Sequence, residues 1–534
     1  MASLRAYFAH AAGFAETRGG ALATFGAALA VWWIQAIAMP LAGGRDFGTY
    51  LGALIELFQS DPIDLGYVLG RTPLAPLVMG ALLVPFGGAL AEPLMSLLYA
   101  ASILAWFLAA RRFGGGAALV TVVVLLAYPG YGILFHELGS DSVFAAAFAG
   151  WSLLAVRVLE RPTTSGFVLL GSGVAVLTLV RPGNQVLVVL AVVAFALAAS
   201  WRARVTWAAA FVVPVVVLLG AWTVHNGVRF HDYTIARGGN AFLFYRAFLV
   251  DRIVRPDNGP ASRALARAVA SDLLPYAPYR PYGVTMEQFF EDPSPRMLED
   301  VGALVNRRWG WNTDQEIVGK AAREAVRTHP GTYARGVAST SFAFLRKPLF
   351  RTLAPTGYRA DEPSDQDDSG QKDFIVVNGR RLPRPSEGEP IPAAREGGVA
   401  TPDGSIRTVW TSDYEHHLVF ENPGDEQRYD ALHRRMTELA DHLPDRSGVA
   451  TLALRLNQAS RWFPPPVVWL LVGVVALVAR RPRRALVLSV PAIAGLLVIL
   501  LTSLGLPAIP HYSVPVAPAF VLLMAGALLA PRRE

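Results

Sequence analysis

Long apolar stretches without charge alternate with short polar segments over most of the chain outside residues 225–461. A helix needs roughly 20 apolar residues to cross the hydrocarbon core of a bilayer, where an ion is not solvated. The candidate stretches are residues 19–44, 72–91, 93–110, 113–135, 142–156, 163–180, 182–201, 205–224, 462–479, 485–510 and 512–531. This pattern predicts a polytopic α-helical membrane protein.

Basic residues at the ends of these stretches indicate which of them cross, because Lys and Arg accumulate on the cytoplasmic side. The basic clusters are Arg5 with Arg18, Arg111 with Arg112, Arg157 with Arg161, Arg202 with Arg204, Arg480 to Arg484, and Arg532 with Arg533. All can be cytoplasmic together only if one early stretch does not cross. Residues 72–91 fit that role because prolines and a Gly-Gly pair interrupt them. We therefore predict about 10 transmembrane helices, both termini inside, and a juxtamembrane or re-entrant helix on the outer side.

This topology divides the chain into three parts. They are an N-terminal transmembrane module at 1–224, an extracytoplasmic domain at 225–461 and C-terminal transmembrane helices at 462–534. The first part includes an outer loop at 43–92. In the outer domain, which we expect to be α or α/β, residues 352–400 are rich in Asp, Ser, Pro and Gly, as in flexible segments. The periodicity of residues 425–443 predicts an amphipathic helix.

Composition narrows the class of protein. Hydrophobic residues make up 53% of the chain and charged residues only 17%. The net charge of +7 comes from arginines near span ends, so we attribute it to topology and expect membrane lipids, not nucleic acid, as surroundings. The absence of Cys excludes disulfides, Cys-ligated zinc and thiol catalysis. Richness in Ala, Gly, Val and Arg suggests a bacterium, and the first apolar stretch is too long for a cleavable signal peptide.

The first outer loop carries an acidic residue directly at the end of a predicted span. Asp46 and Tyr50 lie one helical turn apart if a helix begins there. A carboxylate beside the bilayer can take a proton from a hydroxyl that attacks a reacting centre at headgroup level. Asp is also a favoured helix N-cap, so a purely structural role for Asp46 is an equal alternative.

Two arginines are placed on the outer side by this topology. Arg71 lies at the membrane face, and Arg181 is an exception to the accumulation of basic residues on the cytoplasmic side. Arg71 precedes a proline that starts a helix, and Arg181 lies between two apolar stretches. A guanidinium binds phosphate through two hydrogen bonds, so both are candidates for a lipid phosphate site. The alternatives are an interfacial Arg71 that reaches the headgroups, and a structural ion pair of Arg181 with Asp46, Glu137 or Asp141.

The second outer loop and later outer segments supply further polar residues. His136, Glu137 and Asp141 lie close together, and Ser140 or Asp141 is expected to cap the next span. Two acids and a His can hold a divalent metal, but their spacing matches no metal motif, so no metal is expected to be required. Residues predicted to contact a substrate are Arg45, Tyr50, His136, Glu137, Asp141, Arg246, His511 and Tyr512.

The order of these motifs resembles the bacterial branch of the GT-C glycosyltransferases, the protein O-mannosyltransferase-like group that includes the lipid A aminoarabinose transferase. That group has an Asp-Glu-x-x-Tyr pattern in its first outer loop, and this chain keeps Asp46 and Tyr50 but has Phe47 as the second residue. The other matching steps are Arg71-Thr72-Pro73-Leu74, Arg111-Arg112-Phe113-Gly114, Asp141, Val180-Arg181-Pro182-Gly183, residues 222–230 and the Tyr-x-x-Pro-x-x-Pro ending at 512–518. The resemblance covers about the first 250 residues and the last 70, and leaves 251–461 unexplained.

The resemblance implies a GT-C fold with a cavity open to the outer side and an inverting transferase activity. A polyprenyl-phosphate sugar would be the donor, with its phosphate near Arg71 and Arg181 and with Asp46 as the base. The acceptor would be an envelope glycan, lipid or protein, and the enzyme would lie in the bacterial inner membrane with its active site facing the periplasm. The loss of the second acid at Phe47 disfavours a metal-assisted variant.

Two other classes of function fit parts of the sequence. A transporter or flippase of lipid-linked sugars would also be polytopic, but transporters usually show two related halves with ionisable residues near mid-span. Here the polar residues gather at outer span ends. A non-catalytic scaffold would leave Arg181 and the acidic loop without a role.

Overall fold

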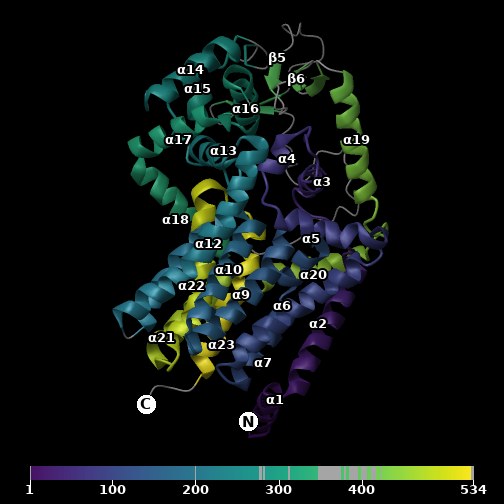
Figure 1. The fold of residues 1–534 in the computed structure, drawn as a ribbon, viewed down its shortest axis with the longest axis vertical. Coiled ribbons are helices and arrows are strands. Elements are labelled where there is room, and N and C mark those ends of the chain that lie inside the picture. Colours follow the sequence, from purple (N-terminus) through teal and green to yellow (C-terminus); the bar gives the residue numbers. More distant parts are fainter. Residues whose placement is uncertain are drawn as a thin grey trace.

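The computed structural model describes residues 2–198, 200–275, 279–280, 283–310, 313–346, 374–377, 380–383, 395–398, 406–410, 416–420 and 423–530. Helices dominate this part of the chain and form a long bundle with a second group of helices and short strands at one end (Figure 1). Helix α1 and the C-terminal end of α23 lie at the opposite end of the bundle. This arrangement agrees with a polytopic helical protein that carries a large segment on one side.

Helices of the bundle account for most of the apolar stretches. They are α1 (Ala2–Ala15), α2 (Arg18–Ala38), α6 (Ala91–Arg111), α7 (Gly115–Ala127), α8 (Pro129–Ile133), η2 (Leu134–His136), α9 (Ser140–Glu160), α10 (Thr164–Val180), η3 (Pro182–Val192), α11 (Val193–Leu197), α12 (Trp201–Phe230), α21 (Pro466–Arg480), α22 (Ala485–Gly505), η8 (Pro510–Tyr512), η9 (Val514–Val516) and α23 (Ala517–Leu529).

Seven helical stretches within the described residues are long and apolar enough to cross a membrane. They are Arg18–Ala38, Ala91–Arg111, Ser140–Glu160, Trp201–Phe230, Ala450–Arg480, Ala485–Gly505 and Pro510–Leu529. The three remaining predicted spans are less regular. Gly115–Ala127 and Pro129–His136 form a pair bent by 67°, while Thr164–Val180 and Pro182–Leu197 are shorter apolar helices. Pro129 and Pro182, each in the first turn after a break, lack the amide hydrogen that a continuous helix would use there.

The first outer loop forms short helices, as predicted. They are α3 (Phe47–Glu56), α4 (Leu65–Leu69), α5 (Leu74–Leu83) and η1 (Pro85–Gly88). Helix α5 has 10 residues, half of what a bilayer crossing needs. The short length of α5 is in keeping with the prediction that residues 72–91 do not cross.

Two of the arginines that are predicted to be cytoplasmic, Arg112 and Arg484, lie close together at one end of the bundle. Glu160, at the end of α9, pairs with Arg112 after α6 (2.5 Å between Nη2 and Oε2) and with Arg484 before α22. The side chain of Glu160 is only 3% exposed, and Arg484 also donates a hydrogen bond to the carbonyl of Arg112 (2.9 Å). Three span ends that lie far apart in the sequence therefore meet at one level.

Small residues let the helices approach closely. A Cβ on Gly171 would lie 1.9 Å from the carbonyl oxygen of Phe211, so α10 and α12 touch backbone to backbone there. Gly473 similarly faces Leu523 and Met524 between α21 and α23. Such contacts at small residues are the usual means by which helices pack in a membrane, where hydrophobic burial between helices gives little.

The second group of helices has a hydrophobic core of its own, which includes Phe248, Leu265, Phe289, Val301 and Ala321. Its helices are α13 (Gly239–Tyr245), η4 (Arg246–Val250), α14 (Pro260–Asp272), α15 (Met286–Glu291), α16 (Pro295–Trp309), α17 (Glu316–Thr328) and α18 (Pro330–Arg346). Between α17 and α14, Glu324 accepts hydrogen bonds from the amides of Ala261 and Ser262 (2.9 and 2.8 Å) and so satisfies the start of α14.

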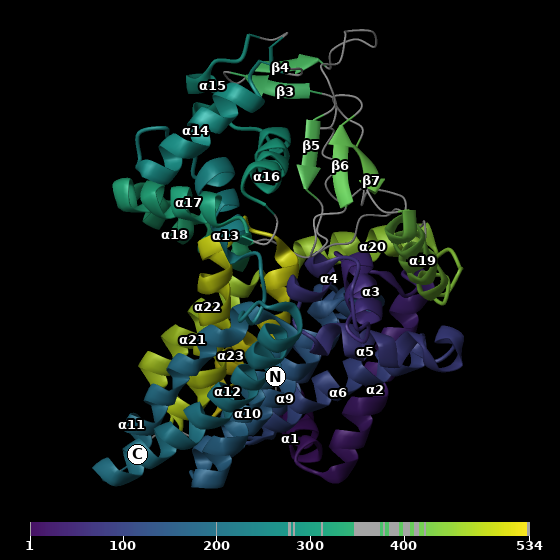
Figure 2. The same ribbon diagram turned by 45° about the horizontal axis from the view of Figure 1, so that its top comes forward.

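Short strands and two further helices complete the outer part (Figure 2). The strands are β3 (Phe374–Val377), β4 (Arg380–Pro383), β5 (Arg395–Gly398), β6 (Ile406–Trp410) and β7 (His416–Phe420), paired antiparallel as β3-β4 and β5-β6-β7. Most of the predicted flexible segment 352–400 lies outside the described residues. The predicted amphipathic helix at 425–443 is α19 (Pro423–Ala440), and α20 (Ala450–Trp462) follows it.

Candidate active site

The two loops that are predicted to lie on the outer side are joined by a short parallel pairing of strands. β1 (Ala42–Gly43) follows the first span, and β2 (Glu137–Leu138) precedes α9. The amide of Gly44 donates a further hydrogen bond to the carbonyl of Leu138 (2.8 Å). A Cβ at Gly44 would lie 2.8 Å from the same oxygen, so only glycine allows this approach. The pairing places the start of α3 beside the start of α9.

Asp46 occupies the N-cap position of α3 but does not act as a cap. Its backbone is left-handed (φ 58°), and its side chain makes no capping hydrogen bond. The carboxylate instead lies 3.4 Å from Nη2 of Arg71 and is 43% exposed. A non-glycine residue in this conformation costs about 1–3 kcal/mol, which is typical of strained residues at functional sites. The structural alternative of a capping aspartate is therefore wrong.

Arg71 lies between the carboxylate of Asp46 and the ring of Tyr50. Its guanidinium carbon is 5.3 Å from the centre of that ring, a cation–π distance, and Nη1 donates to the carbonyl of Gly70 (3.1 Å). The Nε atom is buried and has no hydrogen-bond partner within the described residues. A buried unpaired donor is costly, and a ligand oxygen would satisfy it.

Arg181 is held at two of its nitrogens by the first turn of α9. Nη2 pairs with the carboxylate of Asp141, and Nε donates to the hydroxyl of Ser140 (3.0 Å). The rings of Phe144 and Tyr512 lie 5.4 and 5.0 Å from its guanidinium carbon. Among the three acids weighed as partners of Arg181, the structure selects Asp141.

The first turn of α9 also corrects a prediction. The helix has Gly139 as its N-cap with no side-chain cap, so neither Ser140 nor Asp141 caps it. Ser140 instead accepts hydrogen bonds from Arg181 and from the hydroxyl of Tyr50 (2.7 Å). The sequence alone does not indicate Ser140 as a site residue, because a serine at a helix start is most often a cap.

The last outer turn joins the same cluster. Nε2 of His511 lies 3.2 Å from Oε2 of Glu137, and both side chains are mostly buried. The ring of Tyr512 lies between two guanidinium groups, 5.9 Å from that of Arg45 and 5.0 Å from that of Arg181. The cluster thus draws on α3, the loop before α5, β2, α9, the α10–η3 junction and η8.

Two predicted substrate contacts lie elsewhere. His136 is fully buried and stacks on Trp32 with 4.5 Å between ring centres. Arg246 is also fully buried, and all three of its side-chain nitrogens are bonded, Nε and Nη2 to Asp251 (2.7 and 3.0 Å) and Nη1 to Thr340 (2.7 Å). A substrate could reach Arg246 only by breaking these bonds.

Two acidic residues, Glu56 and Asp64, connect the C-terminal end of α3 to the start of α4. Oε2 of Glu56, at the end of α3, accepts a hydrogen bond from the amide of Asp64 (2.9 Å), and Asp64 caps α4 through the amide of Gly66 (2.7 Å). Burial raises the pKa of Glu56 to about 7 and that of Asp64 to about 6. Arg428 on α19 reaches the same loop at Asp61 (3.2 Å).

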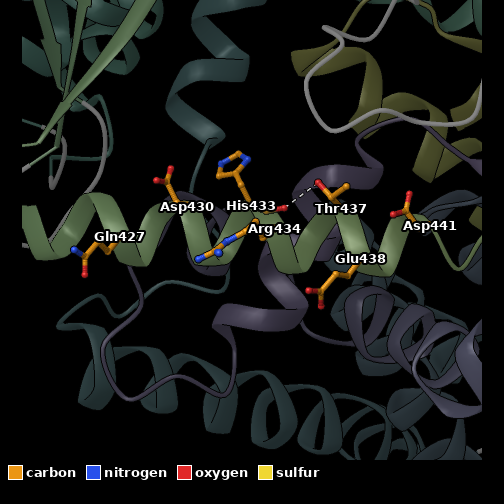
Figure 3. A pocket seen from close by; sticks show the side chains of 7 residues that line it. All are labelled: Gln427, Asp430, His433, Arg434, Thr437, Glu438 and Asp441. Carbon is orange, nitrogen blue, oxygen red and sulfur yellow. Dashed lines mark hydrogen bonds between the residues drawn. The ribbon is translucent and has the colours of Figure 1, made fainter.

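A separate open groove of about 680 Å³ runs along α19 (Figure 3). The residues that line it are Gln427, Asp430, His433, Arg434, Thr437, Glu438 and Asp441. None of them belongs to the cluster around Asp46. Within the described residues, no three His, Cys, Asp or Glu side chains are grouped to hold a metal ion.

The comparison with known protein families covers a segment that contains some of the site residues. Residues 85–223 match the sequence profile of the family described as dolichyl-phosphate-mannose-protein mannosyltransferase. This segment is about a quarter of the chain and contains Glu137, Ser140, Asp141 and Arg181. Asp46, Arg71 and the 511–512 turn lie outside it. No curated protein sequence matches the chain.

Two crystal structures of ArnT from Cupriavidus metallidurans show a weak overall likeness. The structure bound to undecaprenyl phosphate has 16% sequence identity and a TM-score of 0.35, covering 96% of this chain and 77% of that chain. The apo structure has 14% identity and a TM-score of 0.29, covering 96% and 78%. These scores are below those that establish a common overall fold.

Proposed function

We propose that this protein is an inverting GT-C glycosyltransferase that takes a sugar from a polyprenyl-phosphate donor. The match of residues 85–223 to a mannosyltransferase family supports a transferase of this kind. The observation that carries the proposal is the cluster itself. Arg71 and Arg181 are linked through Tyr50 and Ser140, beside the weakly held carboxylate of Asp46.

The two arginines supply an anion site at the level of the outer span ends. Arg71 has a buried Nε without a partner in the described part of the chain. Arg181 donates hydrogen bonds through Nε and Nη2 to Ser140 and Asp141. Planar guanidinium groups suit phosphate because they donate two parallel hydrogen bonds. A phosphate on a lipid anchor would reach this level without leaving the bilayer.

Asp46 is the better candidate for the base. Its side chain is 43% exposed and its one ion pair measures 3.4 Å, whereas Asp141 is 14% exposed and held against Arg181. A base must reach the acceptor hydroxyl, and a carboxylate already committed to a guanidinium is a weaker base. A donor phosphate that binds Arg71 would also weaken its hold on Asp46.

The reaction then follows from charge and geometry. Asp46 takes the proton of the acceptor hydroxyl as that oxygen attacks the anomeric carbon. The bond from this carbon to the phosphate oxygen breaks with its electron pair, and attack from the opposite face inverts the anomeric configuration. The departing phosphate gains negative charge, which Arg71 and Arg181 stabilise, and such stabilisation is strong where water is largely excluded.

We further propose that the protein lies in a bacterial inner membrane with this site on the periplasmic side, and that residues 225–461 help to select the acceptor. The acceptor would be an envelope glycan, lipid or protein that presents a hydroxyl group. The segment boundaries at 224 and 461 remain predictions, although the separate core of α13 to α18 is in keeping with them.

The test uses the purified full-length protein with a panel of polyprenyl-phosphate sugars and envelope fractions as acceptors. We expect acceptor-dependent release of polyprenyl phosphate with at least one donor, and a product whose anomeric configuration is opposite to that of the donor. A flippase would move the donor between leaflets and release none. Transfer with retained configuration would contradict the proposed single displacement.

A further inference from the structure

We infer that Ser140 is a positioning residue that joins the two arginines of the site into one anion-binding unit. This inference rests on the proposed function, because the anion is the phosphate of the donor. The link runs from Arg71 through the ring of Tyr50 to its hydroxyl, then through the Ser140 hydroxyl to Arg181. Ser140 thus accepts hydrogen bonds from both Tyr50 and Arg181.

On one side, Ser140 fixes the plane of the Arg181 guanidinium. Nε donates to Ser140 (3.0 Å) while Nη2 pairs with Asp141, the next residue along the helix. Two neighbouring contacts hold a planar group against rotation, and the rings of Phe144 and Tyr512 restrict it further. Without the hydroxyl, Arg181 would keep its ion pair with Asp141, but Nε would lose its hydrogen-bond partner in a mostly buried side chain.

On the other side, Ser140 fixes the ring on which Arg71 lies. The Tyr50 hydroxyl donates a hydrogen bond to Ser140 (2.7 Å). Tyr50 lies in the first turn of α3, where its backbone N–H donates a hydrogen bond to the carbonyl of Asp46 (3.1 Å). A shift of this ring would move the cation–π contact of Arg71 and the turn that carries Asp46. One serine therefore sets the spacing between α3 and α9 at the site.

Other buried serines on α9 do not have this arrangement. Ser142 donates its proton to backbone carbonyls of its own loop, Glu137 and Gly139 (3.1 and 3.2 Å), which is common for serine near a helix start. The hydroxyl of Ser152 is fully buried and has no hydrogen-bond partner within the described residues. Ser140 instead accepts from two side chains that come from other elements.

The experiment measures binding of undecaprenyl phosphate to purified full-length protein, together with KM for the donor and the thermal unfolding midpoint. Ser140→Ala should weaken binding about tenfold, the usual cost of losing a hydrogen bond to a charged group, with an increase in KM that exceeds the loss in kcat. Ser152→Ala is the matched control and should bind within about twofold of the wild type. Ser140→Thr, which keeps a hydroxyl, should restore most of the affinity.

The link itself is tested by combining Ser140→Ala with Tyr50→Phe, which retains the ring but loses the hydroxyl. Because both changes break the same connection, their effects on binding should not multiply. If Ser140→Ala does not fold, Tyr50→Phe alone should still weaken binding, although by less, because Arg181 keeps its hydrogen bond to Ser140. Wild-type protein that fails to bind undecaprenyl phosphate would overturn the proposed function. Wild-type protein that binds it, with Ser140→Ala or Tyr50→Phe binding equally well, would overturn the role of Ser140 alone.

Discussion

Two arginine–aspartate pairs outside the spans, Arg71 with Asp46 and Arg246 with Asp251, differ in almost every physical respect. The Arg246 side chain is fully buried and that of Asp251 is 4% exposed, and they share two hydrogen bonds of 2.7 and 3.0 Å. Arg71 and Asp46 are 24% and 43% exposed and make one contact of 3.4 Å. Every side-chain nitrogen of Arg246 donates a hydrogen bond, whereas Nε of Arg71 has no partner within the described residues.

This difference separates a structural pair from a candidate functional one. Arg246 also donates to Thr340 and to the carbonyl of Ser503 (2.7 and 3.1 Å), so it ties η4 to α18 and α22. A fully bonded buried charge stabilises one arrangement of helices and cannot exchange partners cheaply. A loosely held, partly exposed pair can exchange its partner for a ligand at low cost.

The largest effect is expected for the exposed pair, on activity. Asp46→Asn removes the proton acceptor while keeping the size of the side chain, so the transfer rate should fall about 10²- to 10⁴-fold, the range for loss of a general base. The unfolding midpoint should stay close to that of the wild type, because the carboxylate caps nothing. The measurement is release of polyprenyl phosphate under saturating donor.

Asp257→Asn provides the control for that variant, since Asp257 is an exposed aspartate of the outer part with no recorded ion pair in the described structure. It should transfer at the wild-type rate. Full activity of Asp46→Asn would show that Asp46 is not the base.

The second prediction contrasts stability with donor binding for the two arginines. Arg246→Met leaves Asp251 as an unpaired buried charge, so the free energy of unfolding should fall by about 3–5 kcal/mol. Arg71→Met should change it by at most about 1 kcal/mol, as for exposed ion pairs, but should weaken donor binding about tenfold or more. Thermal unfolding in detergent and undecaprenyl phosphate binding measure the two quantities on both variants. Equal stability losses would mean that the two pairs do not differ as their burial indicates.

The smallest effect concerns the acid behind α3. Burial raises the pKa of Glu56 to about 7 from an ordinary 4.5, so the folded protein keeps a proton that the unfolded chain has released. This contribution to stability is complete below about pH 4.5 and is lost as the pH rises through about 7. Glu56→Gln stays neutral, and its side-chain oxygen can still accept the hydrogen bond from the amide of Asp64.

Relative to the wild type, Glu56→Gln should therefore be more stable at pH 8 than at pH 5, by ~1–3 kcal/mol in the free energy of unfolding. Unfolding midpoints at the two pH values give the comparison. Glu426→Gln, on the exposed face of α19, should leave the pH dependence as in the wild type. An unchanged pH dependence in Glu56→Gln would show that Glu56 is charged in the folded protein.

Much of the fold follows from the sequence, because charge-free apolar length and arginine placement are local properties. They predict the bundle, the short helices of the first loop and a common side for Arg112 and Arg484, which the structure brings together at Glu160. They do not predict the 67° bend after Ala127, because an apolar count does not register the break that Pro129 makes in the helix.

Only part of the candidate site can be predicted from the sequence, because some of its residues are not conspicuous by charge or position. Residue type and position relative to a span single out Asp46, Arg71 and Arg181, whose charges are conspicuous at a membrane face. The number of hydrogen-bond partners depends on residues far apart in the sequence. Arg246 is therefore predicted as a substrate contact, although Thr340 and Ser503 accept from Nη1 and Asp251 accepts from Nε and Nη2. Ser140 has no charge and an ordinary position at a helix start, and only the fold shows what it accepts.

The two-residue pairing of β1 with β2 restricts length changes in the short segments that lead into α3 and α9. Each residue of an extended strand advances the chain by about 3.3 Å, and a slip of one position turns every side chain to the opposite face. A single insertion or deletion before Asp46 would thus carry its carboxylate away from Arg71 by as much as their present separation of 3.4 Å. Natural variants of this protein are therefore expected to keep the length of the few residues between the first span and α3.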